Sequence, residues 1–212
     1  MITDSLADTE FVVRSIAQTA VENEAEFCEL DSVVGDGDFG YSLARGFEKV
    51  IEDWDGYSRT DSGAFLQAVA TTITSRIGGT SGPLWGTAFL RASMVAKGLT
   101  TLTGTDAVSM LRAAIDGIAQ RGKAAVGDKT LLDALVPAAD ELAAAIAQGG
   151  TTTQILDRVA AATRVAADGT TMMRAMRGRA SYSGDRSMGS PDAGATAVAV
   201  IIERLSDEWK SR

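Results

Sequence analysis

The chain has 212 residues, of which 45% are hydrophobic and 23% charged, and its formal net charge is −8. This length allows one domain with a full core, and an acidic balance without a basic stripe excludes a general nucleic-acid binder. One cysteine and no histidine exclude an intrachain disulfide, a thiolate metal cluster, histidine-based zinc sites and Ser–His–Asp triads within this chain.

Helix-forming residues separated by glycine-rich breaks account for most of the sequence, and strand signals are nearly absent. We predict eight helices, at about residues 3–29, 41–54, 61–77, 81–98, 106–121, 131–148, 152–176 and 194–210. Short connections between helices of similar length favour antiparallel neighbours. The sequence therefore predicts one all-α domain over residues 1–212, an eight-helix antiparallel up-and-down bundle or barrel.

The segment after the first predicted helix carries three aspartates, Asp31, Asp36 and Asp38, set among the glycines of residues 35–40. Carboxylates this close repel one another, so the cluster favours a bound cation, and hard oxygen ligands suit Mg²⁺ or Ca²⁺. The spacing does not fit an EF-hand loop. A plain turn is the alternative, because Asp and Gly are common turn residues. We interpret the segment as a loop that binds metal held by a nucleotide.

Residues 78–84, Gly-Gly-Thr-Ser-Gly-Pro-Leu, lead into the fourth predicted helix. Free N–H groups in a glycine nest, together with the positive end of the helix dipole, favour an anion. A helix stop followed by an N-cap at Ser81 explains the same residues, and no Gly-Lys-Ser/Thr follows to make a Walker A loop. Phosphate binding and a purely structural role therefore both remain open for this segment.

Two long connections complete the pattern, residues 121–130 and 177–192, and long loops in compact domains tend to carry function. In the first, Thr130 is a fair N-cap with Asp133 three residues later, so structure explains it nearly as well as function. The second carries Arg179, and arginine suits bidentate phosphate contacts, although an exposed arginine is usually only solvated.

Together, four segments resemble motifs of the nucleotide-binding L subunit of dihydroxyacetone kinases. The matching family motifs are Gly-Asp-Gly-Asp-His-Gly with a following Arg-Gly-Phe, Gly-Gly-x-Ser-Gly-Pro-Leu, Gly-Asp-Lys-Thr-x-Leu-Asp-Ala-Leu, and Gly-Arg-Ala-Ser-Tyr with Asp-Pro-Gly-Ala. Their counterparts here begin at Gly35, Gly78, Gly127 and Gly178. The matches come in order and span residues 31–196, which makes chance an inadequate explanation.

The resemblance implies an eight-helix barrel with the nucleotide site in loops at one rim. It implies that Asp31, Asp36 and Asp38 hold two Mg²⁺ ions bridged to the phosphates of ADP or ATP, and that these aspartates act in catalysis together with Arg179. The positions that match the family's nucleotide contacts are Phe39, Gly40, Tyr41, Ser42, Gly79, Thr80, Ser81, Gly122, Leu131, Arg179, Asp192, Ala193 and Gly194.

In that family the ketose substrate is held covalently on a histidine of a separate K subunit, which a chain without histidine cannot replace. The resemblance therefore implies a phosphotransferase subunit of glycerol metabolism that works with a K-type partner on dihydroxyacetone or a related short ketose. It leaves open whether the donor is bulk ATP or bound ADP recharged by a phosphotransferase-system protein, and whether the chain forms a homodimer. The absence of an apolar run of about 18 residues or of a signal peptide predicts a cytoplasmic protein without a membrane segment.

Two departures from the family pattern lie near the expected phosphates. Phe39 replaces a histidine, and residues 190–194, Ser-Pro-Asp-Ala-Gly, replace His-Gln-Asp-Pro-Gly. One alternative is therefore a non-catalytic regulatory or apolar-ligand-binding module that keeps the barrel. Another is a stand-alone metal-dependent phosphatase, for which an activating base is hard to find. Retention of the three aspartates and Arg179 favours the kinase subunit over both.

Overall fold

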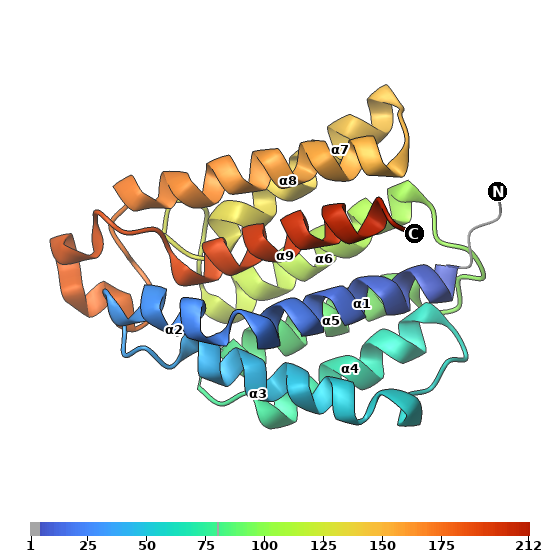
Figure 1. The fold of residues 1–212 in the computed structure, drawn as a ribbon, viewed down its shortest axis with the longest axis horizontal. Coiled ribbons are helices and arrows are strands. Elements are labelled where there is room, and N and C mark those ends of the chain that lie inside the picture. The colour runs from blue at the N-terminus through green and yellow to red at the C-terminus, as the bar shows by residue number, and fades with distance from the viewer. Residues whose placement is uncertain (1–4, 80) are drawn as a thin grey trace.

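The computed structural model describes residues 5–79 and 81–212, and within them the chain is helical with no strand (Figure 1). The α-helices are α1 Ser5–Glu22, α2 Glu24–Ser32, α3 Phe39–Glu52, α4 Ser62–Arg76, α5 Ser81–Ala96, α6 Gly104–Gly122, α7 Leu132–Gln148, α8 Thr152–Gly169 and α9 Ala193–Trp209. Three 3₁₀ helices follow α3 and α8, at Trp54–Gly56, Thr170–Met172 and Arg179–Ser187. The predicted all-α class is confirmed.

Eight of the described helices form a closed ring. The packing order is α1, α3, α4, α5, α6, α7, α8, α9 and back to α1, with α2 packed against α3 (Figure 1). Because neighbours run antiparallel, every second connection lies at the same end of the barrel. The α2–α3, α4–α5, α6–α7 and α8–α9 connections therefore share one rim, at the end opposite the C-terminus.

The described residues contain nine α-helices where eight helices were predicted, because the first predicted helix is two helices that meet at Asn23. The Asn23 backbone leaves the helical region, with φ −102° and ψ 18°, and its side-chain amide donates to the Thr19 carbonyl at 2.8 Å. Asparagine side chains compete with the helix for backbone groups in this way. The seventh predicted helix is also shorter than expected, since α8 ends at Gly169 and a 3₁₀ turn follows.

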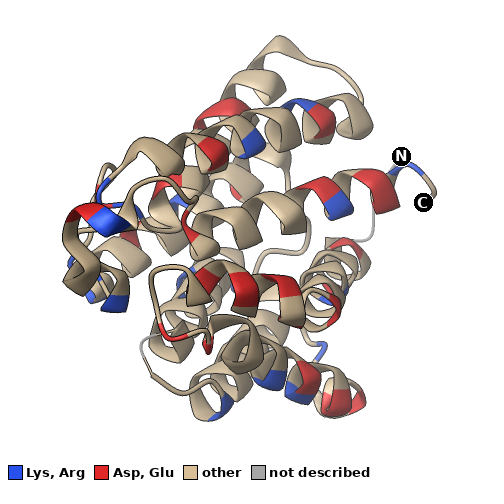
Figure 2. Ribbon diagram, turned by 60° about the vertical axis from the view of Figure 1, so that its left-hand side comes forward, with Lys and Arg blue, Asp and Glu red and all other residues tan. Residues whose placement is uncertain are grey.

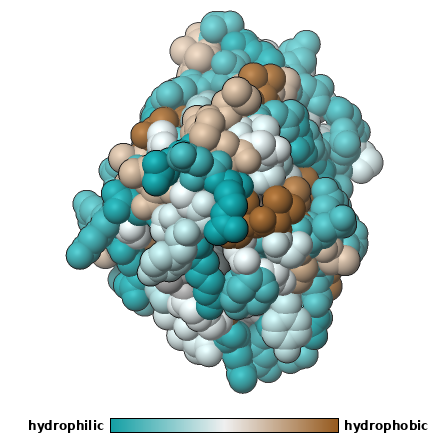
Figure 3. Space-filling view, turned by 90° about the vertical axis from the view of Figure 1, so that its left-hand side faces the viewer, coloured by the Kyte–Doolittle hydropathy of each residue, from teal (hydrophilic) through white to brown (hydrophobic). Residues whose placement is uncertain are grey.

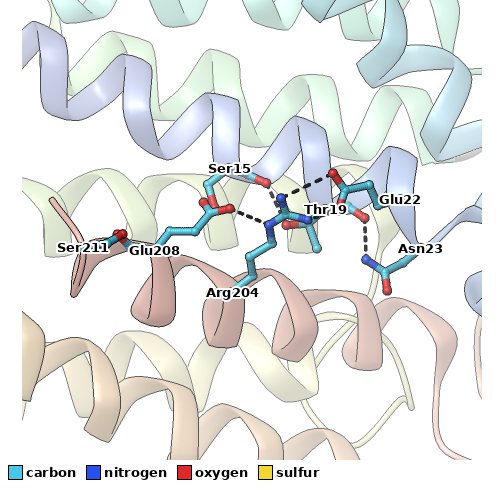
Figure 4. Close-up of polar contacts among 7 residues, drawn as sticks. All are labelled: Ser15, Thr19, Glu22, Asn23, Arg204, Glu208 and Ser211. Atoms are coloured by element: carbon cyan, nitrogen blue, oxygen red, sulfur yellow. Dashed lines mark hydrogen bonds and ion pairs between the residues drawn. The ribbon is translucent and has the colours of Figure 1, made fainter.

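The seam between α9 and α1 closes the ring through an ion-pair cluster (Figure 4). Arg204 of α9 donates to the Glu208 carboxylate at 2.6 Å and pairs with Glu22 of α1. These groups stand on regular helices, and the Arg204 side chain is 27% exposed. The cluster joins the first and last helices of the barrel.

The hydrophobic core lies between α1, α3, α4, α5 and α9, where Phe47 meets Trp85 and Phe89 edge-on with ring centroids 6.0 and 6.1 Å apart. A smaller cluster around Ile118 and Leu132 joins α6 to α7. Between the two clusters lies a mainly apolar cavity of about 500 Å³. Among the described residues, no helix is both long and apolar enough to cross a membrane.

Candidate functional site

The three aspartates of the α2–α3 connection come together at the rim. Asp31 belongs to the last turn of α2, whereas Asp36 and Asp38 lie in the loop that follows. Each offers a carboxylate oxygen, and these oxygens lie within 4.8 Å of one another. The loop can turn this tightly because Gly37 has φ +73° and because a side chain at Gly35 would meet the Asp31 carboxylate.

The electrostatics of this cluster favour a cation. Burial raises the pKa of Asp31, the Phe39 and Gly37 N–H groups oppose that rise, and the neighbouring Asp36 and Asp38 carboxylates add to it. Figure 2 shows acidic residues along α2 and into the loop that follows it. Hard oxygen donors at this spacing, partly open to solvent, fit Mg²⁺, which binds through a few carboxylates together with phosphate oxygens and water.

Arg179 reaches the aspartates from the distant α8–α9 connection. Its guanidinium Nη1 lies 2.9 Å from Asp38 Oδ2 and also pairs with Asp36. Hydrogen bonds to Asp38 and then Asp36 raise the pKa of Arg179. A second link joins the same two loops, where the Ser183 hydroxyl donates to the Val34 carbonyl at 3.1 Å. The structure thus joins the first and last motifs of the sequence.

The start of α3 supplies the next four positions of interest, Phe39, Gly40, Tyr41 and Ser42. A Cβ on Gly40 would lie 2.1 Å from the Glu24 carbonyl oxygen, so only glycine lets α3 begin against α2. The Tyr41 N–H points at Cys28 Sγ, 3.1 Å away. Phe39 packs toward Phe27, with ring centroids 6.1 Å apart. The phenylalanine at the family's histidine position therefore has a packing role.

Leu131, Asp192, Ala193 and Gly194 meet where α7 and α9 begin. The Asp192 carboxylate caps α9 by accepting from the Ala195 N–H at 2.8 Å. A Cβ on Gly194 would lie 3.4 Å from Leu131 Cβ, so the two chain segments are in close contact. Burial raises the pKa of Asp192 to about 6. The predicted N-cap at Thr130 is one residue too early, because Leu131 holds that position and α7 begins at Leu132, although the Thr130 hydroxyl accepts from the Leu132 N–H at 3.2 Å.

The remaining predicted positions lie at the same rim but outside these two groups. Gly79, with φ +63°, precedes α5, Ser81 is the first residue of α5, Gly122 ends α6, and Thr80 lies outside the described residues. Within the described part of the chain, no hydrogen bond or ion pair joins Gly79, Ser81 or Gly122 to the aspartates. Their proximity to the site comes from the shared rim alone.

Lys129 was not among the predicted site residues, but the structure places it inside this rim. Lys129 is 2% exposed, and its ammonium donates to the carbonyls of Ser187 and Ser190. The Asp133 carboxylate similarly accepts from two backbone N–H groups of residues 127–130. The only signal was the Gly-Asp-Lys-Thr order itself, and that order does not say which side chain turns inward.

Fold and site together define an all-helical barrel with a carboxylate cluster and an arginine at one rim, a protein suited to a divalent cation beside an anionic ligand. The sequence profile described as the DAK2 domain matches residues 33–207, and the chain belongs to this family.

Individual relatives agree with this assignment. The chain is 38% identical over 177 residues to the ADP-binding subunit DhaL of the PEP-dependent dihydroxyacetone kinase of Escherichia coli K12, covering 84% of each chain. It is 35% identical over 199 residues to the L-erythrulose 1-kinase of Mycolicibacterium smegmatis, covering 92% of this chain but 34% of that protein.

A solved structure shows the same fold. The chain resembles the dihydroxyacetone kinase of C. freundii in complex with AMP-PNP and Mg²⁺, with a TM-score of 0.76 and 23% identity over 95% of this chain. The match covers 34% of that kinase chain. This chain therefore spans about a third of the longer kinases that it resembles, and 84% of the shorter DhaL subunit.

Proposed function

We propose that this chain is the ADP- or ATP-binding, Mg²⁺-dependent subunit of a kinase for dihydroxyacetone or a related short ketose. The observation that carries the proposal is the cluster of Asp31, Asp36 and Asp38, with oxygens within 4.8 Å and Arg179 beside two of them. The name of the E. coli relative, an ADP-binding subunit, supports it. Because another relative is an L-erythrulose 1-kinase, the proposal does not specify which short ketose is the substrate.

In this proposal the three aspartates hold two Mg²⁺ ions, which neutralise phosphate charge when bound. Arg179 would contact phosphate oxygens, to which its planar guanidinium can donate two hydrogen bonds. The starts of α3 and α5 present backbone N–H groups to the phosphates. Leu131 and Gly194 are in close contact where α7 and α9 begin, and in this proposal they flank the adenine ring of the nucleotide.

The chain supplies the phosphoryl group but not the ketose site, since it has no histidine. A K-type partner subunit would hold the substrate and supply the general base.

The rim also has exposed hydrophobic side chains, namely Val33, Tyr41, Met176, Tyr182 and Met188. Figure 3 shows hydrophobic atoms near the middle of this face, bordered by hydrophilic ones. Such a surface suits a protein contact. For the phosphoryl donor we favour bound ADP recharged by a phosphotransferase-system protein, because the E. coli relative is named PEP-dependent and a Lactococcus lactis relative PTS-dependent.

The test is thermal unfolding of nucleotide-free protein with Mg²⁺ alone, ADP alone, and both. A ligand at about 100 times its Kd adds roughly 2.7 kcal/mol, or about 5–10 °C for a domain of this size. We expect the full shift only with both components, its loss in Asp36→Asn, and its retention in Asp185→Asn, a control at an exposed aspartate of the same rim that pairs with Arg174. No shift with both components would reject the proposal.

The apolar cavity supports a second candidate function, a module that binds an apolar ligand. Its volume of about 500 Å³ is within the range of small-molecule sites, and its lining includes Val13, Trp85, Phe89 and Leu135. Extraction of the purified protein with organic solvent and mass spectrometry tests this candidate. A stoichiometric apolar molecule in a protein that ignores Mg²⁺ and ADP would favour it over the kinase subunit.

A further inference from the structure

The rim contains a buried cation for which the proposed chemistry has no use. Lys129 is 2% exposed, its Nζ lies 2.7 Å from the Ser190 carbonyl oxygen, and it also donates to the Ser187 carbonyl. We propose that Lys129 is a positioning residue of the nucleotide site, which fixes the α8–α9 connection so that Arg179 faces the aspartates. The part of this inference that concerns nucleotide rests on the proposed function.

Placing a lysine at position 129 lowers the stability of the fold in two ways, which indicates that its ammonium has a specific role. Burying an ammonium removes it from water, which is why lysine is almost never fully buried without partners. Its backbone is also left-handed, with φ +60°, a conformation that residues other than Gly, Asn and Asp mostly avoid. Burial lowers the pKa of Lys129, and the charge of Asp192 opposes that shift.

The partners of the ammonium explain what the residue does. Ser187 and Ser190 stand at and just beyond the end of the 3₁₀ helix that Arg179 begins. An apolar side chain at position 129 would fill the space but leave both carbonyls without this donor, whereas an ammonium has three N–H groups in one place. Lys129 therefore ties the far end of the Arg179 segment to the α6–α7 connection.

The near end of the same segment is tied to the neighbouring residue. The Arg177 guanidinium lies 2.8 Å from the Asp128 carboxylate, and the Met176 N–H donates to the Asp128 carbonyl at 3.0 Å. Arg179 itself is 57% exposed, so packing does little to hold its side chain. Its direction depends on a segment that residues 128 and 129 hold at both ends.

The Ser187 side chain completes the anchor. It is fully buried, accepts from the Ala175 N–H at 2.9 Å and donates to the Gly184 carbonyl at 2.6 Å. Residues 175–187 therefore fold around Ser187, whose backbone carbonyl accepts a hydrogen bond from Lys129. Removal of the ammonium should loosen residues 175–190 while the barrel helices keep their packing.

A double-mutant cycle on ADP affinity tests whether Lys129 acts through Arg179. Calorimetry at saturating Mg²⁺ compares the natural chain with Lys129→Met, Arg179→Gln and the double variant. We expect Lys129→Met to weaken ADP binding roughly tenfold in the natural background and to have little effect once Arg179 is gone. An equal loss in both backgrounds would overturn the inference.

Lys123→Met is the matched control, because Lys123 also has a left-handed backbone, with φ +49°, but its side chain is exposed. It should bind ADP like the natural chain. Equal weakening by the two methionine variants would assign the effect to the left-handed backbone and reject a role for the Lys129 ammonium.

Hydrogen exchange supplies a test that needs no nucleotide. In Lys129→Gln, which keeps some donor capacity if the methionine variant fails to fold, the amides of Ala175, Met188 and Gly189 should exchange at least about tenfold faster while those of α4 stay protected. Unchanged exchange, or equal loss of protection in α4, would contradict the inference. Failure of the natural chain to bind ADP would reject the proposed function but leave this result standing.

Discussion

Arg204 and Arg179 each contact two carboxylates, but their surroundings differ, and the difference distinguishes a structural contact between helices from a candidate binding site. Arg204 lies between Glu22 and Glu208 on regular helices and is 27% exposed. Arg179 begins a 3₁₀ helix in the α8–α9 connection, lies beside Asp36 and Asp38 of the α2–α3 loop, and is 57% exposed.

The charge balance of the two clusters also differs. At the seam one arginine faces two carboxylates, whereas at the rim a third carboxylate, Asp31, lies within reach of both partners of Arg179. One arginine cannot neutralise three carboxylates, and the glycines around them bring the backbone close. The rim cluster therefore has one more uncompensated carboxylate than the seam cluster, and it lies on a tight loop that suits a cation, whereas the seam cluster lies on two regular helices and holds them together.

The largest expected effect is on metal-dependent binding at the rim. Asp36→Asn should weaken ADP binding in the presence of Mg²⁺ by about 100-fold or more, because a ligand and its charge are lost. Glu22→Gln removes a carboxylate from the other arginine cluster and should leave the affinity unchanged. Calorimetry on both variants makes the comparison, and equal losses would show that the two clusters do not differ in function.

The next effect concerns the backbone that supports the rim. Gly40→Ala should lower the free energy of unfolding by about 3 kcal/mol, because its Cβ would lie 2.1 Å from the Glu24 carbonyl oxygen. Gly169→Ala, at the end of α8 with open space around it, should be neutral or stabilising by about 0.5–1 kcal/mol. Urea denaturation measures both, and a harmless Gly40→Ala would show that α3 does not need this close approach.

Asp192 gives the pH dependence of the rim. Its folded pKa, about 6, is above the unfolded value of 3.8, so its contribution to stability is fully present below pH 3.8 and is lost as pH rises through 6. Asp192→Asn keeps an oxygen for the Ala195 N–H and should therefore match the natural chain at pH 4 but exceed it by about 1–2 kcal/mol at pH 7.5.

Asp61 is the matched control with the opposite sign. It caps α4, and the Ala64 and Gly98 N–H groups lower its pKa. Its contribution is present above the unfolded pKa and is lost as pH falls, so Asp61→Asn should reduce stability at neutral pH and lose that deficit in acid. Urea unfolding at several pH values measures both variants. Parallel pH profiles for the two would contradict the assigned shift of Asp192.

The smallest effects come from the arginines themselves. Arg204→Gln should lower the free energy of unfolding by about 0.5–1 kcal/mol whether or not Mg²⁺ is present. Arg179→Gln should lower the thermal stability only in the absence of metal, since three carboxylates lose their counter-charge, and Mg²⁺ should restore the loss. Thermal unfolding with and without Mg²⁺ separates the two, and a Mg²⁺-insensitive loss at Arg179 would contradict the counter-charge role.

Much of the fold could be predicted because glycine and polar residues mark most of the positions where helices end. The breaks at residues 78–79 and 149–150 fall where α4 and α7 end. The break at Asn23 could not be predicted, because one asparagine inside a helical pattern is common and only its bond to Thr19 shows the interruption. Local spacing predicts helices well and the side-chain competition that ends them poorly.

Part of the candidate site could also be predicted, because local sequence spacing determines it. Asp31, Asp36 and Asp38 are neighbours in sequence, so their clustering follows from the short loop that carries them. The pairing of Arg179 with Asp36 joins residues 143 positions apart, and only the closed barrel brings them together. The burial of the Lys129 side chain could not be predicted from the sequence, because a lysine in a polar turn is normally exposed.

The central claim is that the rim holds a metal–nucleotide complex, and the most direct measurement counts the metal. Electron paramagnetic resonance of Mn²⁺, titrated into nucleotide-free protein with and without ADP, gives the number of tightly bound ions. The account predicts two ions per chain with ADP, much weaker binding without it, and loss of both sites in Asp36→Asn but not in Glu22→Gln. Tight binding that ignores ADP, or no binding above that of ADP alone in solution, would contradict it.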